Sequence, residues 1–319
     1  MISPLLVIRC LTYNHEPFIR DCLEGFVMQK TNFPFVAIVH DDASTDHTAD
    51  IVREYAEKYP DIIHPIFETE NQYSKRDGSL GRIMNEAIAA TGCKYIAMCE
   101  GDDYWIDPLK LQKQVELLES KPECHWCGCG YYDYNENTKT RGLGSNYNLS
   151  GWIFDDSAKF GPVAATCTLV YRRGDYVDKE MSIKYCVVAG DYLLQAELAH
   201  ESQYAFIPDI MAVYRISGVG VSHRPWKDYS RVEYLKGANA VRRYLAERYP
   251  DSCRFSSVEL DDSDNYAYLK HAIAIGNYRM ARQHQALIVT DACKKKMYCK
   301  FLKGRISFAI LRMAIKYKE

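Results

Sequence analysis

The sequence contains no apolar run that approaches the ~20 residues a helix needs to cross a bilayer. The opening residues Met1 to Pro4 lack the basic region of a secretory signal peptide, so we expect none. The twelve cysteines show no spacing typical of a disulfide scaffold, and several fall within apolar runs. These absences predict a cytoplasmic protein.

The chain also has little net charge. Its 40 basic and 42 acidic residues leave a formal charge of −2, which gives no indication of nucleic-acid binding. A hydrophobic content of 47% and a charged content of 26% are ordinary for a soluble globular protein. Because 319 residues exceed one typical hydrophobic core, we expect a main domain with an appendage.

Apolar runs alternate with amphipathic segments over the first two thirds of the chain. We expect strands over 5–11, 35–40, 62–67, 94–99, 124–132 and 165–171, and helices over 16–29, 46–58, 79–91, 109–118 and 192–200. This order predicts an α/β fold, in which a Rossmann-like, mostly parallel sheet is flanked by helices. The cysteines at 124, 127 and 129 lack a second paired cluster, so we interpret them as part of a buried strand and not as a zinc site.

From about residue 226 the pattern becomes helical, with helices expected over 229–248, 261–275 and 278–289. We therefore divide the chain into a catalytic domain, 1–225, and a helical C-terminal region, 226–319. Residues 294–319 hold nine Lys or Arg and one acidic residue, with apolar residues interleaved. Such a segment is typical of a helix on an anionic membrane surface, and equally of a helix that packs one face on the main domain.

An acidic cluster follows the apolar run 95–99. Glu100, Asp102 and Asp103 would repel one another at the end of a buried strand, and a divalent cation would offset that repulsion. Mg²⁺ is commonly held by one or two carboxylates together with substrate phosphates, so the cluster indicates a metal–diphosphate site. The alternative is a solvated acidic turn that caps the helix after Asp107.

A second acidic cluster, Asp41 to Asp46, follows the apolar run 35–39. In open parallel sheets, ligands bind outside the carboxyl ends of the strands, so two such loops favour a nucleotide site. One loop can accept hydrogen bonds from the base or ribose, and the other can hold the metal. Ser44 to Asp46 also predicts a helix N-cap, which is compatible with this role.

Five segments resemble motifs of family 2 glycosyltransferases, in the order and spacing of that family, over about residues 3–225. They are Leu5–Asn14 with its Thr-Tyr-Asn ending, Val39–Asp46 with a D-D-x-S-x-D loop, Asn85–Asp103, Gly190–Leu194 and Tyr214–Ser222. One departure is Glu100, which stands where many members have Asp.

The resemblance implies a GT-A fold and an inverting, metal-dependent transfer of sugar from a UDP-sugar to an acceptor hydroxyl. It implies that Asp103, helped by Asp102, holds Mn²⁺ or Mg²⁺, and that Asp191 is the general base. It gives the nucleotide-binding candidates as Thr12, Asn14, Asp42 and Asp102. The acceptor in this family is often a lipid-linked or surface polysaccharide, and the basic tail would then hold the enzyme at the inner membrane face.

Two other functions fit a fold of this kind. A sugar-phosphate nucleotidyltransferase shares such a sheet and an acidic metal site, but it usually carries a Gly- and basic-rich loop after the first strand. The segment Thr12 to Pro17 has no Gly, Lys or Arg, which argues against that function. A non-catalytic nucleotide-binding scaffold would keep the fold, yet both acidic clusters and Asp191 are intact here.

Overall fold

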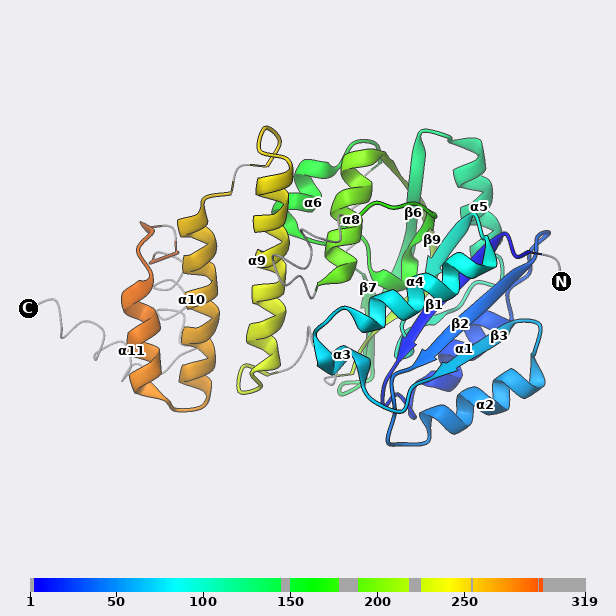
Figure 1. The fold of residues 1–319 in the computed structure, drawn as a ribbon, viewed down its shortest axis with the longest axis horizontal. Helices are drawn as coiled ribbons and strands as arrows, with labels where there is room; N and C mark the ends of the chain where they lie inside the picture. Colours follow the sequence, from blue (N-terminus) through cyan, green and yellow to red (C-terminus); the bar gives the residue numbers. More distant parts are fainter. Residues whose placement is uncertain are drawn as a thin grey trace, which may run out of the picture. The chain divides into compact units, whose positions relative to one another are not determined.

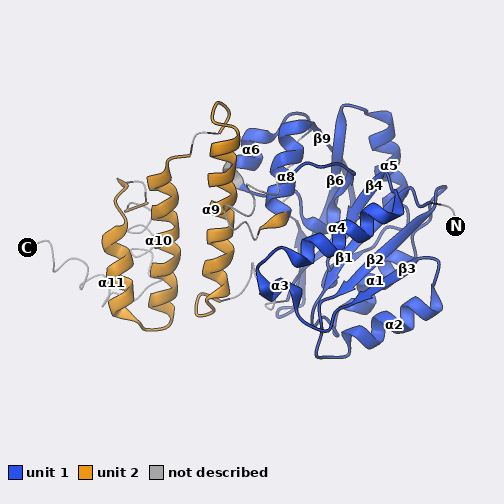
Figure 2. Ribbon diagram, viewed as in Figure 1, with its two compact units in different colours: residues 1–178, 191–217 blue, residues 179–190, 218–319 orange. Residues whose placement is uncertain are grey.

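A computed structural model of the chain describes residues 3–144, 150–177, 189–217, 225–253, 255–291 and 293–294. The chain forms two compact units, one of residues 1–178 and 191–217 and the other of residues 179–190 and 218–319 (Figure 2). The expected functional division at residue 225 stays a prediction.

The described part of the chain forms one mixed nine-stranded sheet in the first unit, in the order β3-β2-β1-β4-β8-β6-β9-β5, with β7 paired to β6 (Figure 1). Its strands are β1 (Leu6–Thr12), β2 (Phe35–Asp41), β3 (Ile63–Phe67), β4 (Tyr95–Met98), β5 (Tyr104–Trp105), β6 (Cys124–Asn135), β7 (Thr140–Leu143), β8 (Val170–Arg172) and β9 (Gln203–Ile216). Pairing is parallel from β3 through β2 and β1 to β4, and again between β6 and β9. β8 runs antiparallel between the two parallel groups.

The helices of the first unit are α1 (Ile19–Val27), α2 (Thr48–Lys58), α3 (Gln72–Lys75), α4 (Ser79–Thr91), α5 (Lys110–Ser120), α6 (Phe154–Phe160) and α8 (Gly190–Glu201). The predicted α/β architecture with flanking helices is confirmed. The segment expected as a strand over 165–171 differs, because it contains a 3-10 turn at Thr166–Thr168 before β8. Strand β9 has no counterpart among the expected strands.

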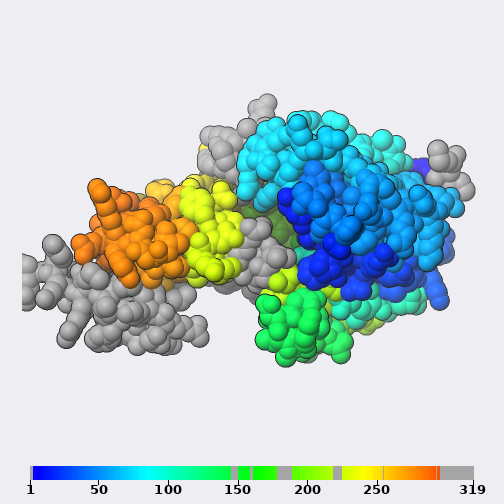
Figure 3. Space-filling view, turned by 90° about the horizontal axis from the view of Figure 1, so that it is seen from below, coloured from blue at the N-terminus to red at the C-terminus, as the bar shows by residue number. Residues whose placement is uncertain are grey.

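Strand alternation separates the two faces of the sheet. On β1, Leu6, Ile8 and Cys10 belong to the main core, which they form with residues of α1, α2 and α5. Val7 and Arg9 therefore point to the other face, which α4 crosses (Figure 1). In a space-filling view, the N-terminal part of the chain, coloured blue, forms one continuous area of the surface (Figure 3).

The cysteines of β6 follow the expected strand interpretation. Cys124, Cys127 and Cys129 are all buried, and none of the three is disulfide-bonded. Burial raises the pKa of the Cys127 thiol to about 12, so this sulfur stays protonated at neutral pH. The cysteines thus fill the core, as predicted for a buried strand.

The second unit contains three described helices, α9 (Ser230–Arg248), α10 (Ser257–Ala274) and α11 (Tyr278–Leu287). Leu269 and Ala272 of α10 pack against Ala281 of α11. Among the described residues, no helix is long and apolar enough to cross a membrane. Apart from Lys294, the basic segment 294–319 lies outside the described residues.

Asp262 of α10 holds the segment that follows α11. It is 1% exposed, and its carboxylate accepts the backbone N–H groups of Val289 and Thr290 at 2.9 and 2.7 Å. Asp262→Ala would leave these donors without an acceptor, so we expect a loss of about 1–3 kcal/mol of unfolding free energy in urea titrations. Asp261→Ala is the matched control, because Asp261 is 67% exposed and makes only a surface ion pair. Equal losses in the two variants would contradict this role.

The same carboxylate predicts acid sensitivity. Burial alone would raise the pKa of Asp262, but hydrogen bonds from Thr290 and Val289 outweigh burial and lower it from its ordinary value of 3.8. A lowered folded-state pKa stabilises the protein above the unfolded-state pKa. That contribution is lost as the pH falls below 3.8 and through the folded-state pKa. Urea titrations of wild type and Asp262→Ala should therefore converge at acidic pH.

Candidate functional site

The carboxyl ends of β1, β2 and β4 meet at one edge of the sheet (Figure 1). Thr12 pairs in register with Asp41, and the Asp42 N–H donates to the Thr12 carbonyl at 3.0 Å. The Gly101 N–H donates to the Leu11 carbonyl at 2.9 Å. Both acidic loops predicted from the sequence therefore lie beside the end of the first strand, as the parallel order requires.

Asn14 joins the first loop to the second. It adopts a left-handed backbone conformation with φ of 54°, which Asn tolerates better than most residues. Its N–H donates to Ser44 Oγ at 2.9 Å, and its side-chain Oδ1 accepts the Thr45 N–H at 2.8 Å. In this structure Asn14 thus fixes the geometry of the two loops.

Asp42 is 4% exposed, and both oxygens of its carboxylate accept backbone N–H groups at the start of α3. The donors are Gln72 at 2.6 Å and Tyr73 at 3.0 Å. Asp42 therefore anchors helix α3 beside the strand ends. Its expected contact with a base would use the remaining lone pairs, and it stays a prediction.

Three buried polar atoms in this region have no hydrogen-bond partner within the described part of the chain. They are Thr12 Oγ1, His15 Nδ1 and Asp41 Oδ1. Burial, opposed by neighbouring Asp102 and Asp46, lowers the pKa of His15, so neutral imidazole is favoured. Because buried polar atoms are rarely left unpaired in proteins, a water molecule or a polar ligand would complete these hydrogen bonds.

The carboxylates of the third loop differ in exposure. Asp103 is 2% exposed, and its Oδ1 accepts the backbone N–H of Arg215 at 2.7 Å. Burial, and then the charge of Asp102, raise the pKa of Asp103 well above its ordinary value. Asp102 is only half-buried, so it is the better placed of the two to reach a ligand.

Glu100 is tied to strand β1. Its Oε1 pairs with Arg9 Nη1 at 3.2 Å, and its Oε2 accepts the Leu11 N–H at 3.2 Å. Burial raises the pKa of Glu100 to about 7; the charge of Arg9 opposes this rise, whereas Asp102 and Asp191 add to it. Glu100 thus connects the metal-binding candidates electrostatically with Asp191, far along the chain.

Asp191 lies in the first turn of α8 and is half-buried. Burial raises its pKa, although backbone N–H groups at the helix start and the charge of Arg9 lower it in part. A carboxylate that is held partly out of water and has a raised pKa is suited to proton transfer. Its catalytic role stays a prediction.

Asp102 and Asp103 fit a metal ion that is also bound by substrate phosphates better than one held by protein ligands alone. No three His, Cys, Asp or Glu residues in the described ranges are arranged to hold a metal ion together. Asp102 and Asp103 are neighbours in this loop, and the charge of Asp102 helps to raise the pKa of Asp103, so a positive charge beside them would stabilise both carboxylates. A cation bound by one or two of these oxygens, and otherwise by phosphate oxygens, satisfies both observations.

Gly101 lies between Glu100 and Asp102, at a position where no side chain fits. A Cβ at this position would lie 2.6 Å from Thr12 Oγ1 and 2.9 Å from His15 Nδ1. We expect Gly101→Ala to lower the free energy of unfolding by about 1–3 kcal/mol in urea titrations, since the loop must shift to relieve the overlap. Gly81→Ala in α4 is the control, because a Cβ there meets nothing within 4 Å. A stable Gly101→Ala protein would show that this contact is soft.

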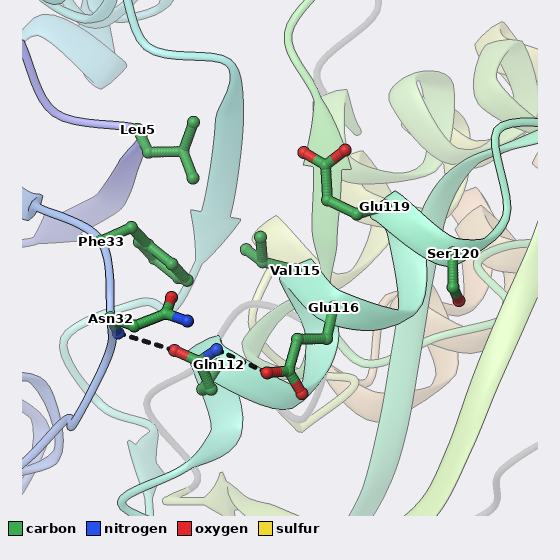
Figure 4. Close-up of a pocket in the computed structure, with 8 residues that line it drawn as sticks. All are labelled: Leu5, Asn32, Phe33, Gln112, Val115, Glu116, Glu119 and Ser120. Atoms are coloured by element: carbon green, nitrogen blue, oxygen red, sulfur yellow. Dashed lines mark hydrogen bonds between the residues drawn. The ribbon is translucent and has the colours of Figure 1, made fainter.

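A surface depression lies at the opposite ends of the strands (Figure 4). Its lining comes from the segments that precede β1 and β2, and from one side of α5. The residues are Leu5, Asn32, Phe33, Gln112, Val115, Glu116, Glu119 and Ser120. Because none of the candidate residues contributes to it, we assign it no part in the site.

Three residues that support this site had no role assigned from the sequence, although Arg215 lies in the segment Tyr214–Ser222. Arg9 pairs with Glu100, Arg215 anchors Asp103, and His15 lies against Gly101. A charged residue in the middle of an apolar strand is the one sequence feature that could have singled out Arg9.

A family model described as glycosyl transferase family 2 matches residues 10–174. An uncharacterized protein of Mycobacterium tuberculosis is 35% identical over 232 residues, which cover 71% of this chain and 63% of the relative. TuaG of Bacillus subtilis, a putative teichuronic acid biosynthesis glycosyltransferase, is 30% identical over 129 residues, or 40% of this chain and 47% of its own. The chain thus spans less than two thirds of these relatives' length.

Two solved structures resemble the fold. S. aureus TarS 1–349 in complex with UDP gives a TM-score of 0.52 at 13% identity, over 94% of this chain and 92% of that one. The mannosyltransferase PcManGT of Pyrobaculum calidifontis, in complex with GDP-Man and Mn²⁺, gives 0.52 at 17% identity, over 99% and 80%. The expected GT-A fold is confirmed by this likeness.

Proposed function

The chain belongs to glycosyl transferase family 2, and we propose that it transfers a sugar from a UDP-sugar to an acceptor hydroxyl with inversion at the anomeric carbon. The observation that carries this proposal is the meeting of three groups at one edge of the sheet. These are the loop after β1, the loop after β2 and the loop with Glu100 to Asp103, and the charge of Asp191, which helps to raise the pKa of Glu100, supports adding Asp191 to them.

We propose that the nucleotide lies against the loops after β1 and β2. Within the part of the chain that the structure describes, Thr12 Oγ1 and Asp41 Oδ1 have no hydrogen-bond partner, and a ribose or base can complete their hydrogen bonds. The candidates Asn14 and Asp42 hold these loops and helix α3 in place. A bound UDP is consistent with TarS, whose structure contains it, and a GDP donor, as in PcManGT, is the alternative that a donor panel tests.

The chemistry needs charge stabilisation and a base. Asp102, with Asp103 beneath it, would hold Mn²⁺ or Mg²⁺, which stabilises the negative charge that develops on the leaving diphosphate. Mn²⁺ is present in the PcManGT complex. Asp191 would remove the acceptor proton as the new bond forms, from the side opposite the leaving group.

We further propose that the acceptor is a surface polysaccharide or a lipid-linked glycan. TuaG, the relative described for teichuronic acid biosynthesis, supports this class. Residues 294–319 would then hold the cytoplasmic enzyme at the inner membrane face by their nine basic residues. Co-sedimentation with anionic vesicles, compared between the full chain and a chain without these residues, tests that part.

Calorimetric titration with UDP, with and without Mn²⁺, tests the proposed function directly. We expect binding that strengthens at least about tenfold with Mn²⁺, followed by slow hydrolysis of one donor in a panel of UDP- and GDP-sugars. Binding without any metal dependence would favour a scaffold. Release of pyrophosphate from a nucleoside triphosphate and a sugar phosphate would favour a nucleotidyltransferase.

A further inference from the structure

Arg9 is a charged residue in the middle of a buried strand, and its side chain is only 17% exposed. The neighbouring residues Ile8 and Cys10 point into the main core, so strand alternation directs Arg9 to the other face of the sheet. Burying a guanidinium without a partner is strongly unfavourable, so a position of this kind requires a compensating anion.

Glu100 supplies that anion from the end of β4. Ala97 and Cys99 belong to the main core, so Glu100 projects to the same face as Arg9. Its two oxygens are taken by Arg9 Nη1 and the Leu11 N–H, both at 3.2 Å. The carboxylate is thus held against β1, whereas the neighbouring Asp102 is half-buried with no such anchor to β1 among the described contacts.

Tyr171 of β8 pairs with Ile96 of β4, and Arg9 pairs with Met98, so Tyr171 projects to the same face of the sheet as Arg9. Arg9 lowers the pKa of both Tyr171 and Asp191, against the effect of burial, and Asp191 raises the pKa of Glu100. Arg9 thus contacts Glu100 directly, and its charge also acts on Asp191 at the start of α8.

We propose that Arg9 is a positioning residue that holds Glu100 against β1 and off the metal, and whose positive charge also acts on Asp191. The inference rests on the proposed function. It deepens that function by assigning Glu100 to the support of the proposed general base, Asp191, and not to the metal. It explains why this chain has the longer Glu where many family members have Asp. The extra methylene lets the carboxylate reach Arg9 and the Leu11 N–H together.

The first test separates a metal ligand from a positioning residue. In Glu100→Gln, calorimetry with UDP and Mn²⁺ should give an affinity within about threefold of wild type, because Glu100 does not bind the metal. Asp102→Asn should lose at least about tenfold in the same titration. A tenfold loss in Glu100→Gln would overturn the proposal.

The second test is a double-mutant cycle. Arg9→Met leaves Glu100 uncompensated beside Asp191, and Glu100→Gln leaves Arg9 free to pair with the base. Each should lower kcat by at least about tenfold, with the KM for the donor nearly unchanged. The double variant removes both excess charges and should recover kcat to within about fivefold of wild type. Losses that multiply in the double variant would contradict the coupling.

Arg20→Met is the matched control, since it removes the exposed ion pair between Arg20 and Glu54 on the surface. Thermal unfolding establishes that each variant is folded. Should Arg9→Met fail to fold, Glu100→Asp tests the same pair by withdrawing the carboxylate, and an unchanged kcat would overturn the proposal.

The outcomes distinguish this inference from the proposed function. Wild-type protein that binds UDP without any effect of Mn²⁺ contradicts the proposed function. Metal-dependent UDP binding in wild type, together with multiplicative losses in the cycle, contradicts the role of Arg9 alone.

Discussion

Asp191→Asn is expected to lower kcat by about 10²–10⁴-fold while Mn²⁺-dependent binding of UDP stays within about threefold of wild type. The amide keeps the size of the side chain but cannot take a proton from the acceptor. Because Asp191, at the start of α8, is proposed to act on the acceptor and not to bind the nucleotide, donor binding should be little affected. Single-turnover transfer and calorimetry together measure the two quantities.

The pH profile gives an independent check on the same residue. Burial raises the pKa of Asp191 from 3.8, so the protonated, inactive form persists to higher pH than for an ordinary Asp. We expect kcat/KM to fall toward acid with a midpoint above 3.8, and this limb to vanish in the residual activity of Asp191→Asn. Asp50→Asn, at a position 67% exposed on α2, is the control. Near-full activity in Asp191→Asn would show that another group is the base.

Asp102→Asn is the second variant with a large expected effect. Removing the half-buried carboxylate should abolish the enhancement of UDP binding by Mn²⁺ and lower transfer by at least about 10³-fold, since the leaving diphosphate loses its counter-charge. Titration of Mn²⁺ at fixed UDP measures the first effect, and transfer at saturating metal measures the second.

Asp103→Ala provides a contrast, because Asp103 is buried and accepts the Arg215 N–H. We expect it to lose both activity and about 1–3 kcal/mol of unfolding free energy, whereas Asp102→Asn loses activity alone. Full stability of Asp103→Ala would indicate that its carboxylate serves only the metal. Retained Mn²⁺ enhancement in Asp102→Asn would transfer the main ligand role to Asp103.

The sequence was sufficient to predict the strands and loops at the end of β1, where we propose that the nucleotide binds. Apolar runs over 35–40 and 94–99 end in acidic clusters, and parallel order then requires the two clusters to meet. The structure bears out this part, since β1, β2 and β4 pair in register. Local patterning and topology rules were enough because each strand is short, apolar and regular.

The contacts that hold the carboxylates were not predictable in the same way. Arg9 meets Glu100 across 91 positions, and Arg215 meets Asp103 across 112. No local pattern encodes such pairs, because they depend on the register of distant strands. Asp191 was found from the family motif alone.

Strand β9 was missed for a physical reason. Pro208 and Asp209 interrupt its apolar pattern, and the pairing of β6 with β9 shifts register on both sides of Gly130. At that point a Cβ on Gly130 would lie 2.8 Å from the Pro208 carbonyl, so only glycine allows the approach. An irregular strand of this kind has no clear alternation of apolar and polar residues from which it could be predicted.

The hydrogen bonds of Asn14 with Ser44 and Thr45, and those of Asp42 with helix α3, join atoms of the chain itself and need no ligand to complete them. We therefore expect that these loops do not have to close when the proposed donor binds, and that binding costs little conformational entropy of the chain. Association with UDP should be rapid and single-phased in stopped-flow traces, with a small change in heat capacity. A slow phase in the kinetics would then be expected only when the acceptor binds, and not when the nucleotide binds.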